Sequence, residues 1–187
     1  YDGGAHTVSV GKAEAGAETV TLSYSLDGTT WGTEADVKFT DVTGPRTVYV
    51  KASAPGYEDK TADSTVTITP AAVTVTADAK SKQYGTADPA LTYQKGSGVN
   101  GEVPAFSGEL SREEGEAVGT YRISQNTVAL VDNGSFKASN YTIEYKEALL
   151  EIVKNNSLEL TLVPYSGTYD GNAHTVSVTK ASAGTET

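Results

Sequence analysis

Histidine side chains are the first groups in this sequence that could act as a base. The two histidines, His6 and His174, follow the same Tyr-Asp-Gly motif, so each copy of the motif holds one histidine. A nucleophilic triad requires a base within reach of a nucleophile and an orienting acid. A single histidine at the start of a strand more commonly caps a turn or packs at the end of a β-sandwich. We therefore predict a structural role for both.

Carboxylates could supply the pair of acids that a glycosidase uses. Paired carboxylates occur at Glu113-Glu114 with Glu116, and at Glu109. A glycosidase needs two carboxylates that face each other across a cleft, about 5–10 Å apart. Here the acids share one glycine-flanked turn with Arg112, which predicts a solvent-exposed loop. The sequence therefore predicts that the chain is not an enzyme and uses no cofactor.

Two oxygen-rich turns could offer ligands to calcium. They begin at Asp27 and at Asp132-Asn133, and both continue into glycine and hydroxyl residues. Calcium takes six to eight oxygen ligands, and neither turn matches the twelve-residue loop that ends in glutamate. Asp-Gly and Asn-Gly are also ordinary turn formers. We expect no metal site, with Asp27, Asp132 and Asn133 as the candidates if one exists.

Aromatic and lysine side chains raise two further kinds of site. Eleven tyrosines and Trp31 could form a surface that stacks on sugars or binds protein. Most tyrosines occupy alternating strand positions, which favours core packing. Trp31 lies in a turn and is the candidate ligand contact, with local packing as the alternative. Lysine–asparagine isopeptide bonds occur in some surface proteins, but no spacing singles out a pair such as Lys51 and Asn140.

The two ends of the chain repeat each other at an offset of 168 residues. Tyr1–Thr19 and Tyr169–Thr187 are identical at 15 of 19 positions. One β-sandwich uses about 100 residues or fewer, so one period should hold two modules. The second copy stops before it could bury a core, and the chain has no methionine. We therefore expect the natural protein to continue beyond both ends.

Composition and charge exclude several classes of partner. The chain has no cysteine, hence no disulfide and no cysteine-based metal site. The net charge of -10 disfavours nucleic acid, whose phosphates are neutralised by clustered Lys and Arg. It also disfavours anionic membranes. No apolar run approaches 18 residues, so we predict no membrane insertion in this segment.

Short alternating strands separated by turns predict an all-β fold. Between residues 19 and 26 a period of two places Val20, Leu22, Tyr24 and Leu26 on one face and Thr and Ser toward water. Strands are predicted at 7–10, 19–26, 36–40, 46–52, 64–69, 73–77, 91–93, 105–110, 121–123, 141–145 and 149–154. Residues 111–116 form a turn at most. The predicted fold is two small β-sandwich modules, immunoglobulin-like or related, in tandem with a partial third repeat.

Several motifs in residues 72–154 occur in one order. They are the Tyr84-Gly85-Thr86 triplet, the Gly-Glu-x-x-Gly-x-Tyr run at 115–121, the Asn140-Tyr141 pair and a closing strand. In these motifs the segment resembles the MBG (YGX-type) repeat family of bacterial surface proteins. Residues 1–70 resemble bacterial immunoglobulin-like surface repeats in their Tyr-Asp-Gly start, the turn at 25–31 and the turn at 54–57. These resemblances imply β-sandwich folds, an extracellular location and a role as a stalk or adhesive array, without catalytic residues.

These patterns divide the chain into three segments. Residues 1–70 are an immunoglobulin-like module that lacks its first strand, 71–154 an MBG-like module, and 155–187 the incomplete start of the next immunoglobulin-like repeat. Leu158, Leu160 and Leu162 alternate with polar residues and predict an amphipathic strand before the second copy. An unfilled sheet edge and a free matching strand favour strand exchange between chains, through residues 156–178. The alternatives are an unordered tail or a tail that forms its own hairpin.

The sequence thus predicts a non-catalytic structural repeat of an extracellular, adhesin-like bacterial protein attached to the cell wall or cell surface. Its expected partners are neighbouring repeats of the same chain. Acting as a stalk, it would hold a distal domain away from the cell. The alternative is that the modules themselves bind a host or environmental glycan or protein, for which an aromatic cleft around Trp31 would be the evidence.

Overall fold

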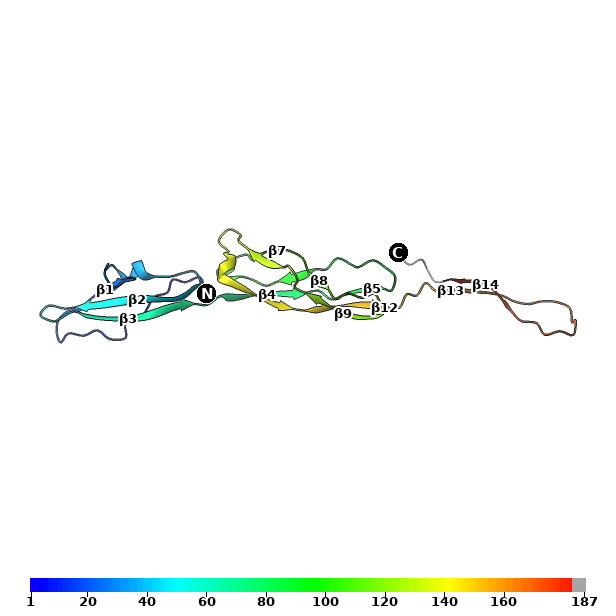
Figure 1. The fold of residues 1–187 in the computed structure, drawn as a ribbon, viewed down its shortest axis with the longest axis horizontal. Coiled ribbons are helices and arrows are strands. Elements are labelled where there is room, and N and C mark those ends of the chain that lie inside the picture. The colour runs from blue at the N-terminus through cyan, green and yellow to red at the C-terminus, as the bar shows by residue number, and fades with distance from the viewer. Residues whose placement is uncertain (183–187) are drawn as a thin grey trace. The chain divides into compact units, whose positions relative to one another are not determined.

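The computed structural model describes residues 1–182, and its regular secondary structure is almost entirely β-strand (Figure 1). The strands are β1 (Thr21–Ser25), β2 (Thr43–Ser53), β3 (Lys60–Ile68), β4 (Ala71–Ala77), β5 (Lys80–Gln83), β6 (Tyr93–Lys95), β7 (Ala105–Ser107), β8 (Ser111–Arg112), β9 (Gly119–Ser124), β10 (Ala129–Val131), β11 (Tyr141–Lys146), β12 (Ala148–Val153), β13 (Glu159–Val163) and β14 (Ser177–Ser182). Three short 3-10 helices are η1 (Glu34–Val37), η2 (Val99–Gly101) and η3 (Ala138–Asn140). With 46% strand and 5% helix, the predicted all-β fold is confirmed. Within the described residues, no helix has both the length and the apolar character needed to cross a membrane.

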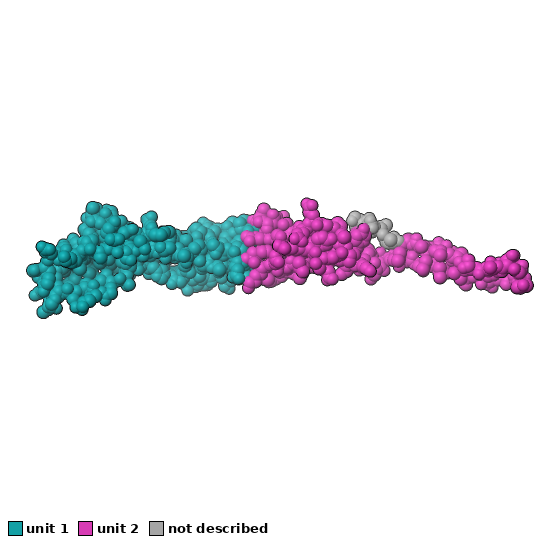
Figure 2. Space-filling model, turned by 60° about the horizontal axis from the view of Figure 1, so that its bottom comes forward, with its two compact units in different colours: residues 1–75, 95–107, 128–144 teal, residues 76–94, 108–127, 145–187 magenta. Residues whose placement is uncertain are grey.

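The chain forms two compact units (Figure 2). Unit 1 contains residues 1–75, 95–107 and 128–144, and unit 2 contains 76–94, 108–127 and the described chain from 145 onward. Strands β4 and β11 pass from one unit into the other. The segment predicted at 71–154 therefore contributes to both units.

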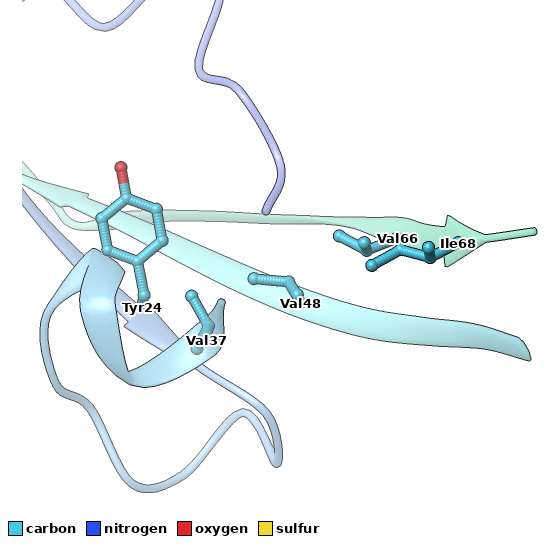
Figure 3. Close-up of a cluster of buried hydrophobic side chains, with 5 residues drawn as sticks. All are labelled: Tyr24, Val37, Val48, Val66 and Ile68. Atoms are coloured by element: carbon cyan, nitrogen blue, oxygen red, sulfur yellow. The ribbon is translucent and has the colours of Figure 1, made fainter. Parts of the chain in front are cut away.

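The first sheet of unit 1 is antiparallel, in the order β1-β2-β3. Its long central strand pairs Tyr24 of β1 with Val50, and Val66 of β3 with Arg46. One face of this sheet carries the core cluster shown in Figure 3, formed by Tyr24, Val37, Val48, Val66 and Ile68. The alternation of apolar and polar residues along β2 and β3 produces this face, because successive side chains point to opposite sides of a strand.

The structure corrects the predicted strand at 36–40. Residues 34–37 form η1, and only Phe39 beyond it makes a β-bridge, with His6. The carboxylate of Asp36 accepts hydrogen bonds from both the backbone N–H and the hydroxyl of Thr33, at 2.7 and 2.8 Å. This capping interaction closes a helical turn where the pattern alone suggested an extended chain.

Three further expectations for residues 1–70 are wrong. Ser25 was expected to face water but is 2% exposed, because its hydroxyl oxygen accepts the N–H groups of Asp27 and Gly28. Leu26 was expected to face the core but is 47% exposed at the start of that turn. Residues 7–10 form no strand, although their sequence alternates.

A second core in unit 1 lies beside strand β4, in the sheet ordered β11-β4-β6. It is formed by Val73, Phe136 and Tyr141, with the rings of Phe136 and Tyr141 stacked 4.6 Å apart. Strands β7 and β10 pair antiparallel, and Phe106 of β7 and Leu130 of β10 pack against this core.

Unit 2 contains a four-stranded sheet in the order β5-β12-β9-β8. Strand β12 pairs parallel with β5 and antiparallel with β9. Leu150 of β12 and Ile123 of β9 are fully buried and form its core with Ala77. Sequence alternation predicted β9 and β12 but missed β5, whose Lys-Ser-Lys-Gln sequence has no apolar residue.

The C-terminal part of unit 2 forms a hairpin of β13 and β14. Glu159 pairs with Ser182 and Leu162 with Val178, with a register shift between Thr161 and Leu162. Every residue of both strands is exposed. The predicted strand at 158–162 is therefore present, and in this single chain it pairs with its own tail.

Candidate functional site

A buried asparagine joins two segments of unit 1 that lie far apart in sequence. Asn140, the last residue of η3, is 1% exposed. Its side-chain oxygen accepts the backbone N–H of Val42 at 2.8 Å, and its side-chain nitrogen donates to Asp41 at 2.9 Å. Lys137 adds an ion pair to the same carboxylate at 2.6 Å. The chain before β2 is thereby tied to the chain before β11.

Two tyrosines that share one carboxylate make a second connection within unit 1. The hydroxyls of Tyr1 and Tyr141 donate to the two oxygens of Glu102, at 2.7 and 2.8 Å. The two rings meet edge to face at 5.3 Å. The hydrogen bond to Glu102 raises the pKa of Tyr1 to about 12, and burial is the main cause that raises the pKa of Tyr141. Both tyrosines therefore remain protonated donors throughout the physiological pH range.

Tyr1 and the residue after it connect the two cores of unit 1. The Tyr1 ring packs against both apolar clusters. The backbone oxygen of Asp2 accepts a hydrogen bond from the side chain of Asn100 at 2.8 Å. Together with Asn140, these contacts define what we call the joint: residues 1–2, 41–42, 99–102 and 137–141.

Each histidine closes a turn in its copy of the repeat, as the sequence predicted. The Asp2 carboxylate accepts the Gly4 N–H at 2.8 Å and contacts His6 Nε2 at 2.7 Å. Asp170 does the same with Asn172 N–H and His174 Nε2, at 2.9 and 2.7 Å. Both copies of the repeat therefore have the same hydrogen-bonded turn, which we call the Asp-x-x-x-His clip.

Unit 2 contains a cluster of four charged side chains that sequence reasoning did not bring together. Lys82 of β5 is 4% exposed at its side chain and bonds Asp88 at 2.6 Å and Glu116 at 2.5 Å. Arg112 of β8 bonds the same two carboxylates and lies 5.4 Å from the ring of Tyr121. Glu116 was expected in a solvated loop, and it does lie on the surface, but as a partner of two cations.

The electrostatics of this cluster fix every member in its charged state. Hydrogen bonds from Arg112 and then Lys82 lower the pKa of Asp88, and Lys82 is the main cause that lowers the pKa of Glu116. Hydrogen bonding to Asp88 and Glu116 in turn raises the pKa of Lys82. An amine is a nucleophile only when neutral, so the cluster suits structural anchoring rather than covalent chemistry.

The candidate calcium ligands form hydrogen bonds with backbone groups. The Asp27 carboxylate accepts hydrogen bonds from the N–H groups of Thr29 and Thr30, both at 2.7 Å, and these bonds strongly lower its pKa. Asp132 accepts the Ala138 N–H at 2.9 Å, and the Asn133 side chain donates to Val103 at 3.2 Å. Within residues 1–182, no three His, Cys, Asp or Glu side chains are grouped so that they could hold a metal ion.

Trp31 is half-buried under a lysine. Lys51 Nζ lies 4.9 Å from the centre of the Trp31 ring and 3.7 Å from Asp59. A shallow hollow of about 470 Å³ beside the ring is also lined by Tyr24 and Leu26. The partners of Lys51 thus differ from those of Asn140, with which sequence reasoning had considered an isopeptide bond.

Comparison with known protein families identifies one part of the chain. Residues 73–151 match the family model described as MBG domain (YGX type). This segment is an MBG domain. The family is associated with bacterial surface proteins. No curated protein and no solved structure is significantly similar to the chain.

Two motifs of the MBG domain meet in unit 2. The Tyr84-Gly85-Thr86 turn leads from Lys82 to Asp88, and the Gly-Glu-x-x-Gly-x-Tyr run holds Glu116. Gly115 has a positive φ of 140° and lies against the ring of Tyr121, where a side chain would collide. The Tyr121 hydroxyl closes the turn on Ala117 at 2.7 Å. The motif residues therefore position the charged cluster. Sequence reasoning missed this cluster because the polar sequence of β5 gave no sign of a strand at Lys82.

Replacing Lys82 by methionine should destabilise the MBG domain in a pH-dependent way. We expect the melting temperature to fall by roughly 5 °C at neutral pH. Asp88 and Glu116 have lowered pKa values in the folded chain, so their contribution is present above about pH 4 and is lost as pH falls through those values. The Lys82 contribution, with its raised pKa, is lost only as pH rises beyond about 10.5.

Thermal unfolding of wild type and Lys82→Met between acid and neutral pH measures this difference, with the exposed Lys154→Met as the matched control. The difference should shrink below about pH 4. A constant difference across the whole pH range would contradict the electrostatic assignment.

Proposed function

We propose that this chain is a non-catalytic structural repeat of an extracellular, adhesin-like bacterial surface protein attached to the cell wall or cell surface. In this proposal the chain works as a spacer that holds a distal part of the protein away from the cell. It divides into an immunoglobulin-like module at 1–70, an MBG module at 71–154 and the start of a further repeat at 155–187. Its partners are the neighbouring repeats.

The observation that carries this proposal is the joint in unit 1. A spacer must transmit orientation from one segment to the next, and a flexible linker would not do so. Here a buried amide, a shared carboxylate between two tyrosines and an ion pair connect the two segments. Buried polar groups with all partners satisfied favour one arrangement, because any other leaves them unpaired.

The charged and polar side chains that we considered for catalysis or metal binding support the same proposal. The histidines close turns, Asp27 and Asp132 bind backbone N–H groups, and the Lys82 cluster holds its amine protonated. Each of these groups is committed to shaping the chain. The MBG family match adds the association with bacterial surface proteins.

Distances within unit 1 test the spacer function, and the cysteine-free sequence makes specific spin labelling simple. With labels at Ala35→Cys and Ala129→Cys, both exposed, we expect one narrow distance distribution. Asn140→Ala should broaden it and lower the free energy of unfolding by about 1–3 kcal/mol, since it leaves the Val42 N–H and Asp41 unpaired. Asn172→Ala, an exposed asparagine in the tail, is the control. A broad distribution in the unmutated background would contradict the proposal.

The second candidate function is direct binding of a glycan or protein, and the hollow beside Trp31 is the observation that favours it. In the spacer proposal, Trp31→Ala costs about 1–2 kcal/mol of stability through lost packing and the lost lysine contact. A glycan array and a host-protein screen then show no ligand for the wild type. Binding that disappears in Trp31→Ala but persists in Tyr57→Ala, a control at an exposed tyrosine, would favour the alternative.

A further inference from the structure

A reactive pair of residues lies in the turn that leads into the second core of unit 1. Asn133 is followed by Gly134, and both residues are exposed. Two hydrogen bonds of 2.9 Å close the turn, from the Asn133 N–H to the Phe136 oxygen and from the Phe136 N–H to the Asn133 oxygen. The side-chain amide of Asn133 and the backbone nitrogen of Gly134 are therefore neighbours in an open turn.

An asparagine side chain can react with the backbone nitrogen of the residue that follows it. That nitrogen loses its proton and attacks the side-chain carbon Cγ, so that an N–Cγ bond closes a five-membered imide ring. The Cγ–Nδ2 bond breaks, and Nδ2 takes up the proton and leaves as ammonia. Water then opens the imide, which gives aspartate by attack at Cγ and isoaspartate by attack at the backbone carbonyl carbon. The reaction needs water and no other partner.

The turn leaves the reacting nitrogen accessible. Glycine has no side chain to shield it, and a Cβ built on Gly134 would meet no heavy atom within 4 Å. The positive φ of 58° at Gly134 is a conformation that glycine adopts without strain. Neither hydrogen bond of the turn uses the Gly134 N–H. The bond from Phe136 to the Asn133 oxygen also polarises this peptide group, which makes the Gly134 N–H a stronger acid.

We propose that Asn133 is a site of spontaneous covalent modification, at which the side-chain amide is lost and aspartate or isoaspartate forms. The Asn133 amide donates to the Val103 oxygen at 3.2 Å, which is at the long end of the usual range. Val103 is 66% exposed, so water competes for this bond. The bond therefore restrains the side chain weakly, and the side chain is able to turn toward Gly134.

A second Asn-Gly pair, at residues 100–101, is restrained more strongly by the fold. The Asn100 amide donates to the backbone oxygen of Asp2 at 2.8 Å, within the joint. The same nitrogen packs over Gly3, where an added Cβ would come within 2.6 Å of it. Asn100 must leave both contacts to reach the nitrogen of Gly101. We therefore expect the folded chain to modify Asn133 and to protect Asn100.

Modification at Asn133 changes the support of a buried ring. Phe136 is fully buried, and its ring stacks on that of Tyr141. Aspartate removes the donor to Val103 and places a carboxylate opposite that carbonyl oxygen. Isoaspartate also adds one carbon atom to the main chain, between the N–H and the carbonyl group that bond Phe136. Both products should therefore weaken the turn that holds Phe136 in the second core of unit 1.

Peptide mapping by mass spectrometry, on the full chain incubated in mildly alkaline buffer, measures the modification at each asparagine. Alkaline buffer speeds the reaction because the attacking nitrogen must lose its proton. In the folded chain we expect Asn133 to react at least about tenfold faster than Asn100. In the chain unfolded by urea the two should react at similar rates, since both are followed by glycine. Asn172, which is exposed and followed by alanine, is the control and should react more slowly than Asn133.

A variant that keeps the amide tests the effect on stability. Asn133→Gln lengthens the side chain by one carbon, so the ring it would form has six members and closes more slowly. After incubation the melting temperatures of the wild type and of the control Asn172→Gln should fall by roughly 2–4 °C. That of Asn133→Gln should stay at its value before incubation, which also shows that the variant folds. Fresh Asn133→Asp should show part of the fall, because it has the new carboxylate without the longer main chain.

Three results would overturn the proposal. Equal rates at Asn133 and Asn100 in the folded chain show that the fold does not select the site. A rate at Asn133 no higher than that at Asn172 shows that the turn prevents ring closure. A melting temperature that does not change with the fraction of modified Asn133 shows that this turn does not support the core.

Discussion

The arrangement of unit 1 depends on one side-chain amide. Asn140 is buried, and an amide buried without partners is costly, so its oxygen and nitrogen must be satisfied where they lie. They are satisfied by Val42 and Asp41, two residues from a segment almost a hundred positions earlier. The two segments of unit 1 cannot separate without exposing or orphaning these groups. Apolar packing around Tyr1 adds buried apolar surface between the segments. The amide and the paired tyrosines define the direction in which the segments meet.

The two copies of the repeat show that nearly the same local sequence can have different local structures. The Asp-x-x-x-His clip is the same in both copies, because its hydrogen bonds lie within five residues. The strand that follows differs, since a strand needs a neighbour and only residues 177–182 have one. An alternating sequence indicates the capacity to form a strand, and pairing decides whether the strand exists. This explains why a strand was predicted at 7–10 and is not found there.

The sequence therefore predicts some parts of this structure and misses others. Strands with buried branched residues, such as those around Val48, Val73 and Leu150, follow from alternation alone, and the MBG motifs identify residues 73–151. The joint could not be predicted, because nothing near Asn140 indicates that its partner is Val42. The Lys82 cluster was missed for a related reason: β5 is polar, and its only buried residue is a lysine whose partners come from two other turns. The prediction from a period of two also failed at Asp36 and at Ser25, because short-range capping hydrogen bonds form turns there.

Amide hydrogen exchange at Val42 tests the central claim most directly. This N–H lies just before β2, outside the ladder of the sheet, and it donates to the Asn140 side chain. If the joint holds, the Val42 amide exchanges as slowly as that of the buried core residue Val48, because both open only when unit 1 unfolds. Exchange of Val42 at the rate of an unprotected amide, with Val48 still protected, would show that the segments are not fixed to each other and would contradict the account.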